Sequence, residues 1–104
     1  MFRIKDTITG KYMSTGKYSY SSLSWNKKGR TYRELQYIQS SLEGRKYQFY
    51  EWIHAQEIYK LDVYSRNQYI IIHTPEAWDF IPDTVVIEHY YTGEIVAKLK
   101  DFMQ

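Results

Sequence analysis

One amphipathic helix between stretches of strand-like alternation constrains this chain more than any other feature of its sequence. A stripe at the three- and four-residue spacing of a helix face holds Leu35, Ile38, Gln39 and Leu42. This stripe predicts a helix over residues 32–42. A helix beside several strands is typical of an α+β fold, in which helices cover one face of an antiparallel sheet. We therefore expect a small antiparallel sheet with one central helix packed on it.

The residues around that helix indicate where it begins and which side it exposes. Thr31 and Glu34 have the spacing of a capping box, in which each side chain accepts a hydrogen bond from a backbone N–H at the helix start. Gly44 stands where a glycine in the left-handed conformation often ends a helix. Arg33 and Tyr37 fall opposite the apolar stripe, so we expect Tyr37 to be exposed.

Period-two alternation and turn residues predict the strands on either side of the helix. The predicted strands before the helix are residues 2–5, 11–13 and 18–25, with turns at 9–10, 14–16 and 26–29. The predicted strands after it are residues 58–64, 69–73 and 85–91, with a turn at 65–68. We expect the core to bury Leu35, Ile38 and Leu42 of the helix against Ile4, Ile58, Ile70 and Ile72 of the sheet.

Three segments are harder to assign. Residues 45–54 fit neither the helical nor the strand period. Pro75 at a first helical position predicts a short helical turn that Pro82 ends. After residues 92–93, the spacing of the last apolar residues favours a C-terminal helix, with a hairpin strand as the alternative. The chain has no linker, repeat or low-complexity tract, so we expect a single domain over residues 1–104.

The absence of cysteine excludes disulfides, thiolate metal sites and cysteine nucleophiles. A small secreted domain usually needs disulfides, so we expect a cytoplasmic location. Residues 1–6 lack the apolar stretch of a signal peptide, and the longest purely aliphatic run, residues 70–72, is far too short to span a membrane. The composition therefore predicts a soluble protein without a membrane contact.

No catalytic or metal-binding motif stands out in the sequence. His54, His73 and His89 are far apart and have no ligand spacing, and no nucleophile elbow or phosphate-binding glycine loop is present. Asp79 and Asp83 have the separation of an acid–base pair, but a solvated loop is the better interpretation. We therefore expect a non-enzymatic protein without a metal or cofactor.

The charges are unevenly distributed along the chain. Residues 1–46 carry ten Lys and Arg against three Asp and Glu, whereas residues 47–104 carry four against nine. Lys and Arg can contact phosphates, and tyrosine rings can stack on unpaired bases. The basic, tyrosine-rich first half therefore makes a nucleic-acid-binding module one hypothesis, although an ordinary solvated sheet face has the same composition.

Two aromatic groups are candidates for contact with a partner, because Tyr, Trp and Arg dominate binding hot spots. The first group is Tyr37 with its basic neighbours Lys27, Lys28, Arg30 and Arg33. The second group is Trp78 with Phe80, on the loop between the two prolines. The alternatives are an exposed tyrosine without a role and a tryptophan that folds back over the core.

One set of residues, mostly in turns and the expected core, forms a pattern over the N-terminal part of the chain: Phe2–Lys5, Thr9–Tyr12, Ser14, Gly16, Trp25, Lys28–Arg30, Tyr32, the apolar residues Leu35, Ile38 and Leu42, and the stretch Glu57–Val63. This pattern resembles that of short uncharacterised reading frames of large tailed bacteriophages. The resemblance covers residues 2–64 and implies a phage accessory protein in the host cytoplasm that binds and modulates a host or defence macromolecule. A protein partner is the first hypothesis and nucleic acid the alternative, and the oligomeric state stays open. Residues 65–104 depart from the pattern, which leaves room for an activity specific to this chain.

Overall fold

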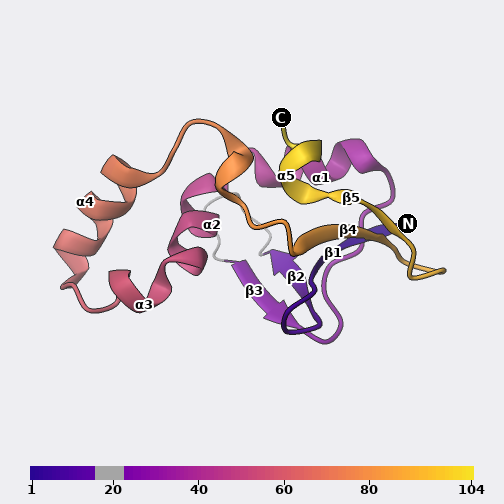
Figure 1. Cartoon of the computed structure of the whole chain (residues 1–104), viewed down its shortest axis with the longest axis horizontal. Helices are drawn as coiled ribbons and strands as arrows, with labels where there is room; N and C mark the ends of the chain where they lie inside the picture. Colours follow the sequence, from indigo (N-terminus) through magenta and orange to yellow (C-terminus); the bar gives the residue numbers. More distant parts are fainter. Residues whose placement is uncertain (16–22) are drawn as a thin grey trace.

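The computed structural model describes residues 1–15 and 23–104, which form an elongated α+β fold of 43 × 26 × 24 Å (Figure 1). Its elements in chain order are β1 (Phe2–Asp6), β2 (Lys11–Thr15), β3 (Leu23–Asn26), α1 (Leu35–Leu42), α2 (Lys46–Ile53), α3 (Ala55–Ile58), α4 (Val63–His73), a 3₁₀ turn (Trp78–Phe80), β4 (Val85–His89), β5 (Ile95–Lys98) and α5 (Leu99–Phe102). The predicted fold class is confirmed.

The strands form one antiparallel sheet in the order β3-β2-β1-β4-β5, with β1 at its centre. Ile4 pairs with Ile87 in the register between β1 and β4. The strands predicted at residues 2–5, 11–13 and 85–91 are therefore confirmed, although β4 ends at residue 89. The turn predicted at 14–16 is wrong for Ser14 and Thr15, which continue β2 and pair with β3. Residues 16–22 of that turn and of the next predicted strand lie outside the described residues.

The connection from β3 to α1 runs back along the sheet and forms backbone hydrogen bonds with β1 and β2. Phe2 and Tyr32 exchange two backbone hydrogen bonds of 2.7 Å, and the backbone N–H of Arg30 donates to the carbonyl of Met13. Gly29 begins this return with a φ of +67°, and a Cβ there would lie 2.3 Å from the Cβ of Tyr12. Only glycine fits this position without strain.

The start of α1 differs from the prediction because Tyr32 pairs with Phe2 of β1 in an isolated bridge. The helix begins at Leu35, and Glu34 is its N-cap without a side-chain hydrogen bond, so the predicted capping box does not form. The predicted left-handed cap at Gly44 is also wrong, because its φ is not positive. Ile38 and Leu42 are buried as predicted, whereas Leu35 is half-buried.

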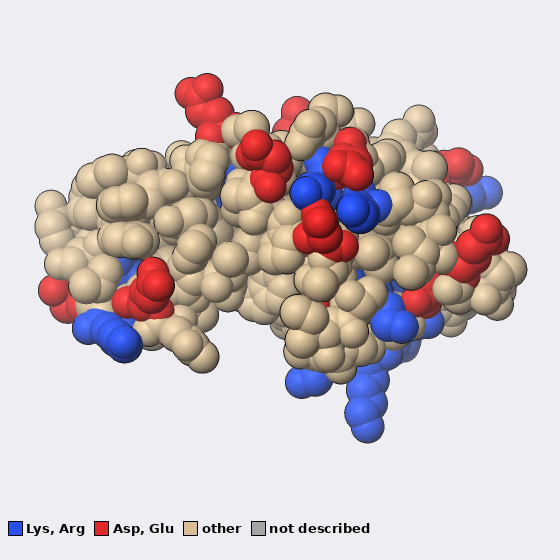
Figure 2. Space-filling view, in the orientation of Figure 1, with Lys and Arg blue, Asp and Glu red and all other residues tan. Residues whose placement is uncertain are grey.

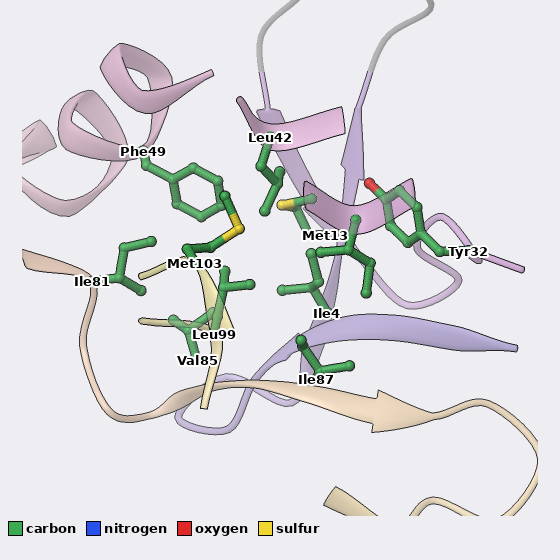
Figure 3. Close-up of a cluster of buried hydrophobic side chains, with 11 residues drawn as sticks. Ile4, Met13, Tyr32, Leu42, Phe49, Ile81, Val85, Ile87, Leu99 and Met103 are labelled. Carbon is green, nitrogen blue, oxygen red and sulfur yellow. The ribbon is translucent and has the colours of Figure 1, made fainter. Parts of the chain in front are cut away.

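One face of the sheet carries the main hydrophobic core. In Figure 1, α1 and α5 cover this face, and α2 lies beside the β3 edge. Figure 3 shows strand side chains such as Ile4 and Met13 pointing toward Leu42 and Phe49 of the helices. The buried cluster consists of Ile4, Met13, Tyr32, Ile38, Leu42, Phe49, Ile81, Val85, Ile87, Leu99 and Met103.

Helices α3 and α4 extend away from the sheet as an arm (Figure 1). The strands predicted at residues 58–64 and 69–73, and the turn between them, are wrong, because this stretch is helical. Asp62 is the N-cap of α4, and its carboxylate accepts a hydrogen bond of 2.9 Å from the backbone N–H of Ser65. The arm contacts α2 through a second small cluster, which consists of Tyr50, Ile58 and Ile70.

The predicted placement of Ile58, Ile70 and Ile72 in the sheet is also wrong. Ile58 and Ile70 are buried, but they lie on the helices of the arm. Ile72 is 71% exposed. Three consecutive β-branched residues resemble a buried strand in a short window, yet a helix distributes them around its axis and buries only one of them here.

The C-terminal segment combines both predicted alternatives. Residues 95–98 form β5, which pairs with β4 as a hairpin, and residues 99–102 form the one-turn helix α5. Leu99 of that helix is buried in the main core, so α5 closes the core over the sheet. The short helical turn predicted after Pro75 is present, but it begins later, at Trp78.

Candidate interaction surfaces

The four predicted basic residues lie on the connection between β3 and α1. We call Lys27, Lys28, Arg30 and Arg33 the basic segment, and all four are exposed. In the part of the chain that the structure describes, no salt bridge pairs any of them with a carboxylate. Asn26 orders the predicted turn at their start, because its side-chain oxygen accepts hydrogen bonds from the backbone N–H groups of Lys28 and Gly29.

Arg30 lies beside the flank of α1 that carries Tyr37. Its guanidinium donates to the hydroxyl of Thr15 at 2.6 Å and reaches the hydroxyl of Ser41 at 3.5 Å. Ser41 is one helical turn after Tyr37, so both face the same flank of α1. Tyr37 is exposed, as the sequence predicts. Arg30 therefore combines a structural contact with a place next to the predicted tyrosine.

Trp78 and Phe80 are half-buried and pack over hydrophobic side chains. Their rings stack with centroids 6.2 Å apart, and Trp78 meets Phe49 edge-on at 5.8 Å. Phe80 also contacts Tyr50, so this pair bridges the main core and the small cluster of the arm. These contacts match the alternative in which the tryptophan covers the core, and a role of either ring in partner contact stays a prediction.

The face of the sheet away from the main core carries a buried carboxylate. The Glu88 side chain is only 5% exposed and lies 3.4 Å from both Arg3 and Lys5. The hydroxyl of Tyr12 donates to it at 2.9 Å. The Arg3 guanidinium stacks on the Tyr12 ring at 3.6 Å from its centroid. Two cations neutralise this carboxylate and the Tyr12 phenol donates a hydrogen bond to it, so Glu88 links β1, β2 and β4.

The β4–β5 hairpin carries an exposed group of apolar side chains that sequence reasoning missed. We call Met1, Tyr90, Tyr91, Ile95 and Val96 the hairpin surface. The Tyr90 and Tyr91 rings meet edge-on at 5.1 Å, and the Tyr91 hydroxyl lies 3.6 Å from the Met1 sulfur. The Arg3 guanidinium lies 5.0 Å from the centre of the Tyr90 ring. The signal in the sequence was the Tyr-Tyr pair beside a turn.

The second surface that sequence reasoning missed is the solvent side of α4. We call it the outer face of α4, and it consists of Val63, Tyr64, Asn67, Gln68, Ile71 and Ile72. Its four apolar side chains are between 57% and 74% exposed. None of the six residues is charged, and the upper part of the left lobe in Figure 2, over α4, shows no charged side chain. Soluble proteins rarely leave such a group of apolar side chains uncovered without an interaction partner.

The three histidines lie in different parts of the fold. His54 lies between α2 and α3, His89 lies in β4, and His73 stacks on Tyr69 of its own helix α4. Among the described residues, no group of three or more His, Asp or Glu side chains is placed to hold a metal ion. A hollow of about 280 Å³ between α2 and the segment after α4 is lined by Glu43, Gly44, Lys46, Tyr47, Thr74, Pro75 and Glu76.

The perturbed carboxyl groups have structural causes. A hydrogen bond and ion pair with Lys100 hold the pKa of Asp83 below its ordinary value, and Lys98 lies 3.6 Å from the same carboxylate. Asp83 therefore ties the loop before β4 to β5 and α5. The backbone N–H of Ser65 likewise lowers the pKa of the Asp62 carboxyl.

Among the described residues, no helix is both long enough and apolar enough to cross a membrane. In the comparisons with known proteins, no family model, no curated protein and no solved structure matches this chain. The resemblance to phage reading frames therefore stays a prediction.

Proposed function

We propose that this chain is a non-enzymatic protein-binding module whose partner contacts the hairpin surface. The observation that carries the proposal is the group of exposed tyrosine, methionine and aliphatic side chains on the β4–β5 hairpin. Aromatic residues, Met and Arg are enriched at protein interfaces, because they offer large contact area, to which Tyr, Trp and Arg add a directional polar group. The hairpin surface has this composition, and Arg3 lies against Tyr90.

The hairpin surface is also ordered before a partner arrives. The backbone N–H of Tyr90 donates to the carbonyl of Met1 at 2.8 Å, which fixes Met1 against the hairpin. Contacts between Met1, Tyr90 and Tyr91 restrict their side chains. A restricted side chain loses less conformational entropy on binding, so these contacts favour affinity.

The backbone of β5 offers a second kind of contact at the same place. It lies at the end of the strand order in the described sheet, and Ile95 and Val96 on it are exposed. An edge strand can accept an extended segment of another protein, with main-chain hydrogen bonds for affinity and side-chain contacts for specificity. A partner that adds a strand to β5 would also cover Ile95 and Val96.

The resemblance to phage accessory proteins supplies the proposed setting. In that setting the partner is a host or defence protein in the bacterial cytoplasm, and binding modulates its activity. The proposal needs no catalytic group of this chain, which agrees with the structural roles of Glu88 and Asp83 described above.

Capture of bacterial proteins by the tagged chain tests the proposal. Two variants each remove one exposed tyrosine, and the two tyrosines lie on different surfaces. Tyr91→Ala removes a tyrosine that is 72% exposed on the hairpin surface, and Tyr64→Ala removes one that is 74% exposed on α4. We expect a bacterial protein to be captured by the native chain and by Tyr64→Ala, before and after nuclease treatment. Tyr91→Ala should weaken that capture at least tenfold, since an interface anchor contributes about 2 kcal/mol or more. Equal capture by a folded Tyr91→Ala variant would refute the proposed surface.

The basic segment supports a second candidate function, binding of nucleic acid. Its exposed cations without carboxylate partners among the described residues are available to phosphates. A suitable variant changes Lys27, Lys28 and Arg33 to Ala together and leaves Arg30, because Arg30 also donates to Thr15. If this function is correct, the variant binds random RNA or DNA more weakly. The slope of log affinity against log salt should then flatten by about one unit per lost phosphate contact.

A further inference from the structure

The residues on the outer face of α4 have a symmetric order. Tyr64 and Ile71 lie along the centre of this face, roughly 100–120° around the helix axis from the buried Ile70. Asn67 and Gln68 lie between them, one on each flank, and the ends of the face are Val63 and Ile72. Along the helix, Val63 and Tyr64 therefore lie as far before the Asn67–Gln68 pair as Ile72 and Ile71 lie after it.

This order is compatible with a two-fold axis. An axis through the point between Asn67 and Gln68, perpendicular to the helix, exchanges the position of Tyr64 with that of Ile71. The same rotation exchanges Val63 with Ile72. A two-fold interface uses the same patch on both subunits, so a surface that it joins must complement itself when turned in this way. The outer face of α4 meets this condition.

We propose that the outer face of α4 binds the same face of a second copy of this chain, with the two helices antiparallel. This self-association goes beyond the proposed function, because it uses the arm, whereas the partner of the proposed function contacts the hairpin surface. The dimer leaves the hairpin surface of each copy accessible.

The pairing gives each side chain of the face a suitable neighbour. Tyr64 of one copy packs against Ile71 of the other, and the two-fold axis repeats this contact. The amides of Asn67 and Gln68 from both copies meet near the axis, where each can donate and accept hydrogen bonds. A buried amide pair at the centre of a helical interface fixes the register of the two helices.

The charges around the face are compatible with a second copy. The face itself is uncharged, so it attracts no charged surface. Lys60 and Asp62 precede α4 and Glu76 follows it, and all three are exposed. In an antiparallel pair, Lys60 of one copy lies at the same end as Glu76 of the other, so each end offers one contact between opposite charges beside the Asp62 carboxylate.

The size of the face predicts a weak, reversible dimer. An α-helix of 11 residues is about 16 Å long, so two such helices bury much less than the roughly 800 Å² per partner of a standard interface. Complexes below that size are typically transient. The dimer should therefore dissociate on dilution and be populated mainly at high chain concentration.

Sedimentation equilibrium between about 1 µM and about 1 mM chain measures this association. We expect a monomer–dimer equilibrium for the native chain and a monomer for Ile71→Glu over the whole range. The matched control is Ile8→Glu, which places the same charge at an isoleucine that is 77% exposed on the β1–β2 turn. This control should dimerise like the native chain. A native chain that stays monomeric, or a dimer that survives Ile71→Glu, would overturn the proposal.

A mixing experiment tests the antiparallel orientation. Tyr64→Glu and Ile71→Lys should each weaken self-association at least tenfold, because each places two uncompensated charges in the interface. When the two variants are mixed, the introduced glutamate of one chain faces the introduced lysine of the other, and the second Tyr64–Ile71 contact stays native. We expect the mixture to form a heterodimer. A mixture in which both chains stay monomeric would exclude the antiparallel pairing.

The proposed partner surface and the proposed dimer can be refuted independently of each other. Partner capture should persist in Ile71→Glu and weaken in Tyr91→Ala, whereas dimerisation should be lost in Ile71→Glu and persist in Tyr91→Ala. Loss of only one property therefore identifies which surface was assigned wrongly.

Discussion

The sheet region buries the large apolar side chains of its core, whereas the arm leaves several of its own exposed to solvent. In the sheet region, strands and helices bury side chains such as Ile4, Ile38 and Phe49 completely. In the arm, α4 buries Ile70 and leaves its neighbours Ile71 and Ile72 in solvent. The sheet region therefore derives its stability from its own core, whereas the arm presents surface that a partner can cover. The comparison separates the part of the chain that stabilises the fold from the part that is available for binding.

The largest expected effect lies in the main core. Phe49→Ala removes a ring that is fully buried between the sheet and the helices and that contacts Trp52 and Trp78. We expect it to lower the free energy of unfolding by about 3–5 kcal/mol, because a cavity remains where the ring was. Chemical denaturation measures the loss. A loss below about 1 kcal/mol would mean that the sheet region does not depend on this core.

The buried carboxylate of the sheet should matter more than a less buried one on α2. Glu88→Ala leaves Tyr12, Arg3 and Lys5 without their shared acceptor, and we expect a loss of about 2–3 kcal/mol in the free energy of unfolding. The matched change is Glu51→Ala, whose carboxylate accepts an exposed hydrogen bond of 2.8 Å from Tyr59. It should cost less than about 0.5 kcal/mol, since water replaces the lost acceptor. Equal losses in the two variants would contradict the difference in burial.

A core change in the arm should act locally. Ile70→Ala removes the buried contact of α4 and should cost about 2 kcal/mol, at the lower end for such a change, because this cluster is small. Since few contacts hold the arm, α4 should open without the sheet. Amide hydrogen exchange should therefore accelerate in residues 63–73 and stay unchanged in β1 and β4. Equal acceleration in both regions would show that the arm and the sheet unfold as one unit.

The smallest expected effect is a pH-dependent one at the start of α4. The Asp62 carboxylate has a pKa below its ordinary value of 3.8, so it stabilises the folded state above that pH. Its contribution is lost as the pH falls through the lowered pKa. Asp62→Ala should therefore be less stable than the native chain at neutral pH, and the two should converge under acid conditions. Thermal unfolding across that range measures the difference, and a gap that widens toward low pH would reverse the assigned sign.

The sequence predicted an element correctly where the apolar residues of that element follow one spacing, either that of a strand or that of a helix. Alternation identified β1 and β4, because each of these strands directs every second side chain into the core. Helical spacing identified α1 and predicted that Tyr37 is exposed. The exact start of α1 was missed because Tyr32 pairs with Phe2, a contact between segments that local spacing does not reveal.

The arm was predicted as strands because its residue types favour strands. Its tertiary contacts favour helices instead. Residues such as Tyr69 and Ile70 have high strand propensity, which is a weak preference that tertiary contacts override. The overlooked signal was Asp62, a strong N-cap residue three positions before Ser65. Because residues 58–73 were predicted as two strands and a turn, the helical spacing of the apolar residues on the outer face of α4 was not recognised. The hairpin surface was missed because exposure of Tyr91 depends on where the turn after β4 falls.

The position of β1 has a consequence for how the chain is made. The central strand β1 is synthesised well before its partner β4, since Glu88 follows Arg3 by 85 positions in the chain. Until β4 leaves the ribosome, Ile4 and Met13 lack the strand that completes their core. The sheet therefore cannot be completed until β4 has been synthesised, and a nascent chain that stops before Val85 exposes its apolar strands to chaperones and to other unfinished chains.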